Sequence, residues 1–294
     1  MQFIQYPTIR TAEFVANLDS GSEEWLELRK QGITGTDVGT LLGVNPYESA
    51  YALYHKKLGL IDDRVPDNNR MKLGRYLETP LLEMFQDNHP ELTLVQVGTY
   101  RHQERKWQIA NPDALAYDGD KLYIVEVKTS RQYWDEIPDH YMAQVNHYLD
   151  VFSADGVIFV TLEGGDYKEY FVECDADTIE VQRELARTFW EENLANEVVP
   201  EWDGAESTYN AVRELSEPSE EGSVDLGDLG VALVNTQKEI DELNDTLNEL
   251  KARTLDAMKD AKYGVVEFEG KEYRAAIKRQ RGEGKPYLQI VKGK

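Results

Sequence analysis

The chain of 294 residues is 41% hydrophobic and 30% charged, which is typical of a soluble globular protein with one main domain and a smaller module. No apolar run approaches the roughly 20 residues needed to cross a bilayer, and residues 1–10 lack the pattern of a secretory signal, so we expect a cytoplasmic protein without a membrane partner. A net charge of −23 excludes nonspecific nucleic-acid binding over the whole surface, and the single cysteine, Cys174, excludes an internal disulfide or a Cys-rich metal site.

Helical patterns predominate in the first hundred residues. Ser22 is a candidate N-cap for the first helix, and Asn45-Pro46 precedes the third. In the fourth helix, Glu78 lies beside an apolar stripe at helical spacing, made of Leu73, Leu77, Leu81 and Phe85. The predicted helices cover residues 23–30, 37–42, 48–58 and 70–88.

Strand patterns follow, interrupted by one helix. They predict strands over 94–100, 107–110 and 122–128, a helix over 139–152, and a strand pair over 156–162 and 167–173 that turns at Gly164-Gly165. A helix over 177–196 comes next. This order predicts an α/β fold with a mixed sheet of about five strands and helices on its faces.

The last third of the chain begins with a polar segment. Residues 197–225 are rich in Glu, Ser, Pro and Gly and have no convincing period, which predicts an acidic linker. Apolar and small residues then recur in steps of three and four, which predicts a long heptad helix. This helix can pack on its own domain or pair with another chain, and the sequence leaves both open. The heptad residues are Leu226, Leu229, Leu233, Thr236, Ile240, Leu243, Leu247, Leu250, Thr254, Ala257 and Ala261.

A hairpin and a basic tail complete this appendage. Strands over 265–269 and 272–277 are predicted to pair across Gly270-Lys271. The expected division is a main domain over 1–196, a linker over 197–225 and a module over 226–294. In so acidic a chain the basic tail is a candidate for nonspecific phosphate contact, and the alternative is a merely solvated C-terminus. Its basic residues are Lys278, Arg279, Arg281, Lys285, Lys292 and Lys294.

The sharpest candidate site combines Asn111-Pro112-Asp113 with the strand segment Glu126-Val127-Lys128. A period of two places Glu126 and Lys128 on one face of their strand. If Asp113 lies at the end of a paired strand, two carboxylates and one ammonium converge. Hard divalent cations prefer carboxylate and carbonyl oxygens and keep several waters, so the cluster is a candidate Mg²⁺ or Mn²⁺ site. Such a metal activates water, and Lys128 could orient or deprotonate that water in phosphodiester hydrolysis.

An Asp followed later by Glu-x-Lys is by itself a weak signal, because many exposed edge strands carry such residues. Here the pattern is preceded by the helix that bears Glu78 and followed by a helix that bears Gln144 and Tyr148. Taken singly, Glu78 would be a solvated residue on a helix, and Gln144 and Tyr148 would be ordinary helix packing. The combination favours a catalytic site.

With these motifs the sequence resembles the lambda-type phage exonucleases of the YqaJ family, within the PD-(D/E)XK nuclease superfamily. The resemblance runs from Ser22 to Asn196. The segments that carry it are Glu24-Trp25-Leu26-Glu27-Leu28-Arg29, Ile33-Thr34-Gly35-Thr36-Asp37, Leu41-Leu42-Gly43, Gly74-Arg75 with Glu78, Asn111-Pro112-Asp113, Glu126-Val127-Lys128, and Tyr141 with Gln144.

The resemblance implies a PD-(D/E)XK core with two Mg²⁺ or Mn²⁺ ions. Asp113, Glu126 and the backbone carbonyl of Val127 would hold metal, Glu78 would contribute on the side of the second ion, and Lys128 would handle the water. The family therefore implies a deoxyribonuclease whose chemistry depends on a metal.

Two further pairs of residues match elements of such nucleases. Gln144 and Tyr148 look like the Gln-x-x-x-Tyr element of RecB-type nucleases, and Arg29 and Thr36 match positions that resemble a receptor for the 5′ phosphate of a DNA end. A guanidinium can grip phosphate by two hydrogen bonds, and a hydroxyl at a helix start adds another donor. Thr36 stands where the family commonly has Ser. The alternatives are a helix-end arginine and a helix cap.

By the same resemblance, the reaction is 5′→3′ hydrolysis of one strand of duplex DNA from its end, which leaves a single strand for an annealing protein in phage-type recombination. Family members often form ring-shaped trimers, so a homo-oligomer is expected, and a phage-encoded protein would act in the cytoplasm of the bacterial host. Two alternatives stay open: a structure-specific or nicking endonuclease, which would cleave a closed circle, and a non-catalytic DNA-end-binding protein.

Overall fold

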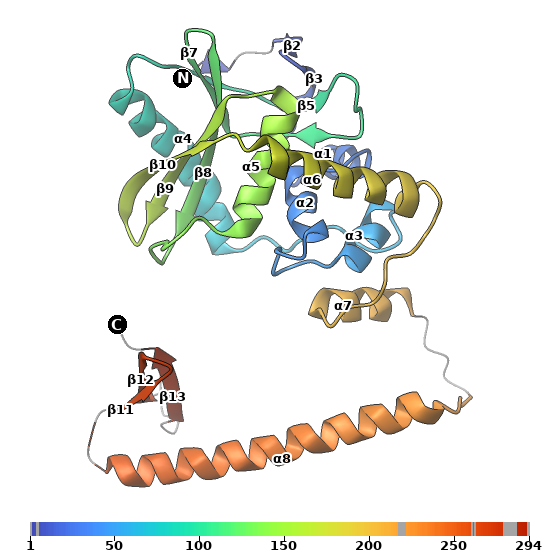
Figure 1. Ribbon diagram of the computed structural model, residues 1–294, viewed down its shortest axis with the longest axis vertical. Coiled ribbons are helices and arrows are strands. Elements are labelled where there is room, and N and C mark those ends of the chain that lie inside the picture. The colour runs from blue at the N-terminus through green and yellow to red at the C-terminus, as the bar shows by residue number, and fades with distance from the viewer. Residues whose placement is uncertain are drawn as a thin grey trace. The chain divides into compact units, whose positions relative to one another are not determined.

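The computed structural model describes residues 2–3, 6–216, 222–259, 261, 263–278 and 287–292. Contacts divide the chain into two compact units, Met1–Glu217 and Pro218–Lys294. The first unit contains a six-stranded and a four-stranded sheet with most of the helices, and the second contains one long helix and a three-stranded sheet (Figure 1). None of the helices in the described ranges is long and apolar enough to cross a membrane.

The six-stranded sheet of the first unit is mixed. Its strands are, in spatial order, β1 (Gln2–Phe3), β4 (Thr93–Gln96), β7 (Ala114–Asp118), β8 (Lys121–Ser130), β9 (Gly156–Glu163) and β10 (Asp166–Glu173). β7 and β8 are antiparallel, β8 and β9 are parallel, and β9 and β10 form a hairpin. β8 therefore lies inside the sheet, paired on both sides.

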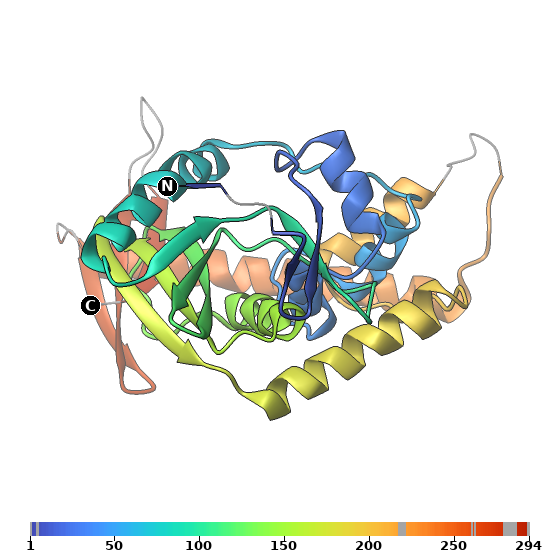
Figure 2. The same ribbon diagram turned by 90° about the horizontal axis from the view of Figure 1, so that it is seen from above.

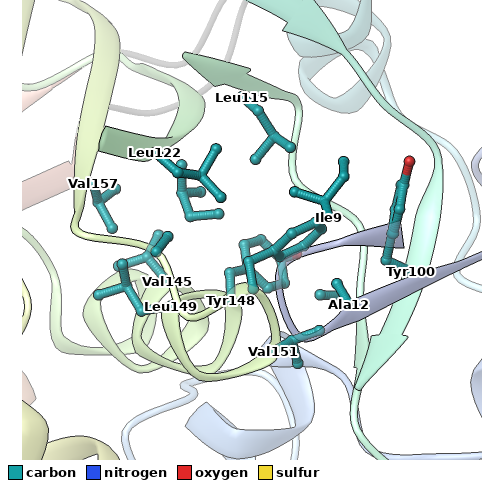
Figure 3. Close-up of a cluster of buried hydrophobic side chains, with 14 of the residues drawn as sticks. Ile9, Ala12, Tyr100, Leu115, Leu122, Val145, Tyr148, Leu149, Val151 and Val157 are labelled. Atoms are coloured by element: carbon teal, nitrogen blue, oxygen red, sulfur yellow. The ribbon is translucent and has the colours of Figure 1, made fainter. Parts of the chain in front are cut away.

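Helices cover both faces of this sheet (Figures 1 and 2). On one face, α5 (Asp139–Phe152) packs Val145 and Leu149 against Leu122 and Val157 (Figure 3). On the other face, α4 (Asn69–Asn88) packs apolar residues against β7, β8 and β9, with Leu82 fully buried. Apolar residues on both faces of β8 explain its burial. The expected α/β class, with a mixed sheet flanked by helices, a long C-terminal helix and a hairpin, is confirmed, although the sheet has six strands rather than five.

A helical layer borders α5. It consists of α1 (Glu23–Lys30), α2 (Gly35–Leu41), α3 (Ala50–Lys57), and α6 (Ala176–Thr188), which continues as the π-helix η1 (Phe189–Leu194). Ser22 and Ser49 cap α1 and α3 through their hydroxyls. In α2, Gly35 approaches α5 so closely that an added Cβ would lie 2.8 Å from the Gln144 carbonyl oxygen. The beginning of α2 is thereby fixed next to the residues of α5.

One expected strand is two strands in two different sheets. Residues 94–100 were predicted as one strand, but the chain leaves β4 and enters β5 (Thr99–His102). β5 belongs to the four-stranded sheet β2-β3-β5-β6, with β2 (Thr8–Ile9), β3 (Ala12–Ala16) and β6 (Ile109–Ala110). Gly98 at the break approaches β3 so closely that a Cβ would lie 2.5 Å from the Ala16 carbonyl oxygen. The strand patterns did not predict β1, β2, β3 or β7, which are short.

Part of the expected acidic linker is helical. Within residues 197–225, α7 (Glu206–Leu215) buries Thr208 and Ala211. The Thr208 hydroxyl donates a hydrogen bond of 2.7 Å to Ser49 Oγ, which anchors α7 at the beginning of α3. Ala211 packs with Tyr51, Ala52 and Ile61, so this part of the expected linker belongs to the first unit.

The second unit is built from α8 (Gly227–Met258) and an antiparallel sheet of β11 (Tyr263–Phe268), β12 (Lys271–Lys278) and β13 (Tyr287–Lys292). Met258, at the end of α8, packs at Gly264 in β11. β13 lies where only a basic tail was expected. Of that tail, Lys278 and Lys292 end β12 and β13, whereas Arg279, Arg281, Lys285 and Lys294 lie outside the described residues.

Candidate active site

The register of β7 and β8 brings Asp113 beside Glu126. Asp113 immediately precedes β7, in which Ala114 is paired with Val125 of β8. The Val127 N–H donates a hydrogen bond of 2.7 Å to Asp113 Oδ2. This bond holds the Asp113 carboxylate against the strand that carries Glu126 and Lys128.

Glu126 is a buried carboxylate, and only one of its two oxygens is hydrogen-bonded to described residues. The residue as a whole has only 2% of its surface exposed. Oε1 accepts hydrogen bonds from Lys128 Nζ at 2.6 Å and from Gln144 Nε2 at 2.8 Å. Oε2 is buried and has no hydrogen-bond partner among the residues that the structure describes. Because an unsatisfied buried polar atom costs free energy, this oxygen indicates a place where a cation or another ligand would bind.

Negative charge is concentrated around Glu126. Burial raises the pKa of Asp113 well above its usual range, and the charges of Glu126 and Glu78 raise it further, against the opposing effect of Lys128. Glu78, which comes from α4 and is half-buried, also has a raised pKa, first through burial and then through Glu126. Clustered carboxylates with raised pKa values are typical of functional sites that take up a cation.

Lys128 keeps its positive charge in this cluster. Burial alone would lower the pKa of Lys128, but the charges of Glu126 and Asp113 outweigh burial and raise it. Its Nζ also lies 4.8 Å from the centre of the Tyr141 ring, a cation–π distance. The side chain is therefore an ammonium held by fixed partners.

Gln144 and Tyr148 lie one turn apart on α5, on the side that faces β8. Gln144 Nε2 donates to Glu126 Oε1 and also, at 3.0 Å, to the Tyr148 hydroxyl oxygen. Tyr148 is buried, and burial together with the Glu126 charge raises the pKa of its hydroxyl. Tyr148 thus reaches the carboxylate only through Gln144, which makes it a positioning residue.

Arg29 and Thr36 occupy different environments. Arg29 lies in the last turn of α1, with its guanidinium carbon 4.5 Å from the centre of the Trp25 ring and Nη2 3.6 Å from Asp37 Oδ1. Arg29 and Tyr148 line the same cavity of about 20 Å³. Thr36 is exposed in the first turn of α2. The structure places Arg29 beside the helix that carries Gln144, but it gives no direct contact between Arg29 and Thr36 within the described residues.

Sequence reasoning did not single out a buried ion pair beneath Arg29. Lys57 Nζ donates to Asp37 Oδ2 at 2.6 Å and, at 2.7 Å each, to the carbonyls of Arg29 and Gly32. Burial would raise the pKa of Asp37, but Lys57 and Arg29 outweigh it and lower the pKa. Asp37 also accepts a bond from the Thr34 N–H, so the capping pattern Thr-x-x-Asp was a usable signal. Lys57 had no such signal because its partners are distant in sequence.

The carboxylates fit a hard divalent cation that keeps part of its water shell. Among the described residues, no group of three or more His, Cys, Asp or Glu side chains is placed to hold an ion by itself. Mg²⁺ is usually held by one or two carboxylates together with waters and substrate phosphates, so a full cage of side chains is not required. The unpaired Glu126 Oε2 beside Asp113 is the observation that matches such a ligand set.

Comparisons with known proteins find similarity to one family model and to one bacterial protein. Residues 24–155 match the model of the YqaJ-like viral recombinase domain. The uncharacterized protein YqaJ of Bacillus subtilis (strain 168) is 27% identical over 276 residues, which cover 88% of this chain and 85% of that protein.

Three solved structures are also similar. LHK-Exo in complex with dAMP has 19% identity and a TM-score of 0.49, covering 60% of this chain and 94% of that one. The alkaline exonuclease LHK-Exo from Laribacter hongkongensis has 18% identity and a TM-score of 0.48, covering 66% and 100%. A phage related exonuclease from Haemophilus somnus 129PT has 10% identity and a TM-score of 0.43, covering 58% and 99%.

The matched segment contains Arg29, Glu78, Asp113, Glu126 and Lys128, and it also includes Gln144 and Tyr148. Residues 24–155 of this chain are therefore similar to the YqaJ-like viral recombinase domain over the segment that contains the candidate site.

Proposed function

We propose that the protein is a metal-dependent 5′→3′ exonuclease that degrades one strand of duplex DNA from its ends and leaves a single strand for annealing. The cluster of Asp113, Glu126 and Lys128, with the unpaired Glu126 Oε2, is the observation that carries this proposal. The YqaJ-like viral recombinase domain supports DNA as the substrate.

Asp113, Glu126 and the carbonyl of Val127 would hold Mg²⁺ or Mn²⁺, with Glu78 on the side of a second ion. The metal, when bound, supplies Lewis acidity that makes water a better nucleophile and neutralises phosphate charge. Lys128, kept as an ammonium, orients the attacking water or donates to a phosphate oxygen, and this role suits its raised pKa better than that of a general base. Gln144 fixes Glu126 Oε1, so that Oε2 keeps one direction.

Arg29 and Thr36 would receive the 5′ phosphate of the strand that is degraded. The Arg29 guanidinium is partly exposed and already oriented by Trp25, so that a phosphate can accept hydrogen bonds from it. The resemblance to phage exonucleases also supports a single-strand annealing protein as partner, a ring-shaped homo-oligomer as the assembly, and the cytoplasm as the place of action.

One set of substrates tests this function. Purified protein is incubated with Mg²⁺, Mn²⁺ or EDTA and with linear duplexes that do or do not carry a 5′ phosphate, labelled at one 5′ or one 3′ end. A covalently closed circle is the comparison. We expect early release of the 5′ label from phosphorylated ends, no release in EDTA, and an intact circle. Cleavage of the circle would identify an endonuclease, and binding of ends without any metal-dependent product would identify a non-catalytic protein.

A further inference from the structure

The long helix α8 has an apolar stripe that the described residues of the second unit leave exposed. α8 is one continuous helix of 32 residues (Figure 1), which corresponds to about 48 Å. Met258 is its one buried residue among those described. On the stripe, Leu229 is 71%, Leu233 67% and Leu243 68% exposed. An apolar stripe in steps of three and four over more than four heptads is typical of a helix that pairs with another helix.

We propose that α8 pairs with α8 of a second copy of this chain in an antiparallel coiled coil. The stripe defines the heptad positions. Leu226, Leu233, Ile240, Leu247 and Thr254 take position a, and Leu229, Thr236, Leu243, Leu250 and Ala257 take position d. A heptad pattern without interruption is expected when two helices pair along their whole length. It is not needed when a helix packs on an irregular surface.

The sizes of the core residues favour the antiparallel direction. With Leu243 of one copy opposite Leu247 of the other, Ile240 lies opposite Leu250 and Leu233 opposite Ala257. Thr236 and Thr254 then share a layer, where their hydroxyls can meet each other. Large residues thus fill the layers that contain small ones, and polar residues are matched. In a parallel pair, Ala257 would face Ala257 and leave a poorly filled layer.

A cavity at the C-terminal end of the stripe supports the same direction. It has a volume of about 540 Å³ and lies between the end of α8 and the sheet, with Thr254, Ala257, Met258, Ala261 and Val265 among its lining residues. In the antiparallel pair, the exposed Leu229 and Leu233 of the second copy reach this apolar hollow. Each copy then supplies large side chains at one end of the seam and a receiving cavity at the other.

Charges beside the seam are complementary in this direction as well. In the antiparallel pair, Glu239 of each copy lies opposite Arg253 of the other, so two ion pairs form. The Arg253 side chain is 75% exposed and also contacts Glu249 of its own helix at 2.6 Å. In a parallel pair, Glu239 would lie opposite Asn244 and Arg253 opposite Met258, and neither ion pair would form.

The stoichiometry is tested by sedimentation equilibrium of the full chain over a range of concentrations. We expect Leu243→Glu, and separately Leu247→Glu, to weaken the association step in which two copies pair through α8 roughly a hundredfold or more, because each places two carboxylates in the seam. A ring formed by the first unit would not be affected by these substitutions. Val231→Glu is the matched control, since Val231 is 59% exposed and lies on the opposite side of α8. Unchanged circular dichroism would show that the variants fold. A monomeric natural protein, or equal association of seam and control variants, would overturn the proposal.

The direction is tested by exchanging charges. Glu239→Arg alone, or Arg253→Glu alone, places like charges opposite each other in the antiparallel pair, and we expect self-association to weaken by roughly tenfold. An equimolar mixture of the two single variants restores both ion pairs and should associate as tightly as the natural protein. If each variant alone associates like the natural protein, or if mixing them restores nothing, the antiparallel arrangement is wrong.

Discussion

Asp113 and Glu126 are the residues on which the proposed chemistry depends most directly. Asp113→Asn keeps an oxygen that can accept the Val127 N–H, but it loses the charge of a metal ligand. We therefore expect Asp113→Asn and Glu126→Gln each to lower Mg²⁺-dependent nuclease activity at least about a hundredfold with folding intact. Release of labelled nucleotides from linear duplex DNA measures this. Asp118→Asn, at the exposed end of β7, is the matched control and should stay fully active.

Asp113→Asn also allows a prediction about stability in the absence of metal. The pKa of Asp113 is raised by burial and then by Glu126 and Glu78, so the folded protein binds a proton more tightly than the unfolded chain does. The corresponding stability is present at low pH and is lost as the pH rises through the raised pKa. In EDTA at pH 8, Asp113→Asn should therefore melt no lower than the natural protein, and Mg²⁺ should raise the melting temperature of the natural protein only. A large Mg²⁺ shift in the variant would contradict the ligand assignment.

Arg29 allows a prediction about the preference for 5′-phosphorylated DNA ends. Replacing the guanidinium with an amide in Arg29→Gln removes a charge-assisted anchor for phosphate but leaves the carboxylate cluster intact. We expect digestion of 5′-phosphorylated ends to slow by roughly tenfold or more, with little effect on unphosphorylated ends. Arg187→Gln on α6 is the control arginine. Equal slowing on both kinds of end would show that Arg29 serves only its contacts with Trp25 and Asp37.

His147 predicts how stability depends on pH. Burial lowers its pKa, and its ring lies 3.1 Å from the Ile109 carbonyl oxygen, so the folded protein keeps the neutral ring. A lowered pKa contributes stability that is present above the unfolded value of about 6.5 and is lost as the pH falls from that value through the lowered pKa of the folded protein. The free energy of unfolding should fall between pH 7.5 and 5.5, and this fall should be smaller in His147→Gln. Denaturant titrations at both pH values measure the free energy of unfolding. An equal fall in the natural protein and in His147→Gln would contradict the prediction.

At the scale of elements, local patterns predicted the helices well and the short strands poorly. The expected helices over 23–30 and 139–152 agree with α1 and α5, because caps and apolar spacing are local signals. The strand patterns did not predict β7, although β7 positions Asp113. This strand is defined by its pairing with β8 rather than by a local pattern. For the site, the common face of Glu126 and Lys128 follows from the strand period of two, whereas Gln144 was expected from the family resemblance. The ion pair of Asp37 and Lys57 does not, because it is made by the packing of α2 and α3.

The contact of α2 with α5 gives a prediction at this scale. A Cβ at Gly35 would lie 2.8 Å from the Gln144 carbonyl oxygen and 2.9 Å from Tyr148 Cε1. Gly35→Ala must therefore shift the two helices, and we expect a loss of about 1–3 kcal/mol in stability together with reduced nuclease activity, since Gln144 holds Glu126. Gly39→Ala in the same helix is the control, because its Cβ would meet His140 at an ordinary 3.5 Å. Equal melting temperatures and activities of the two variants would refute the coupling.

At the scale of the whole molecule, a net charge of −23 means that DNA must be held by limited regions of positive charge. Arg29 and Lys128 provide local positive charge in the first unit. The chain between β12 and β13 adds Arg279, Arg281 and Lys285, which are close together in the sequence. If these three residues contact phosphates, the affinity for duplex DNA should fall steeply as the salt concentration rises. The rate of hydrolysis at the candidate active site should not depend on them.

We expect the triple variant Arg279→Gln, Arg281→Gln and Lys285→Gln to bind duplex DNA more weakly and with a shallower salt dependence. Each phosphate contact that is lost lowers the slope of log K against log salt by about 0.9, so three lost contacts are measurable. The control neutralises three exposed lysines elsewhere, Lys106, Lys121 and Lys238, and thereby gives the same change in net charge. If only overall charge matters, the two triple variants will have the same affinity and slope, which would exclude a role of this segment in holding DNA. If the segment contacts the backbone, the first variant alone will show the reduced slope while hydrolysis of saturating DNA continues at the natural rate.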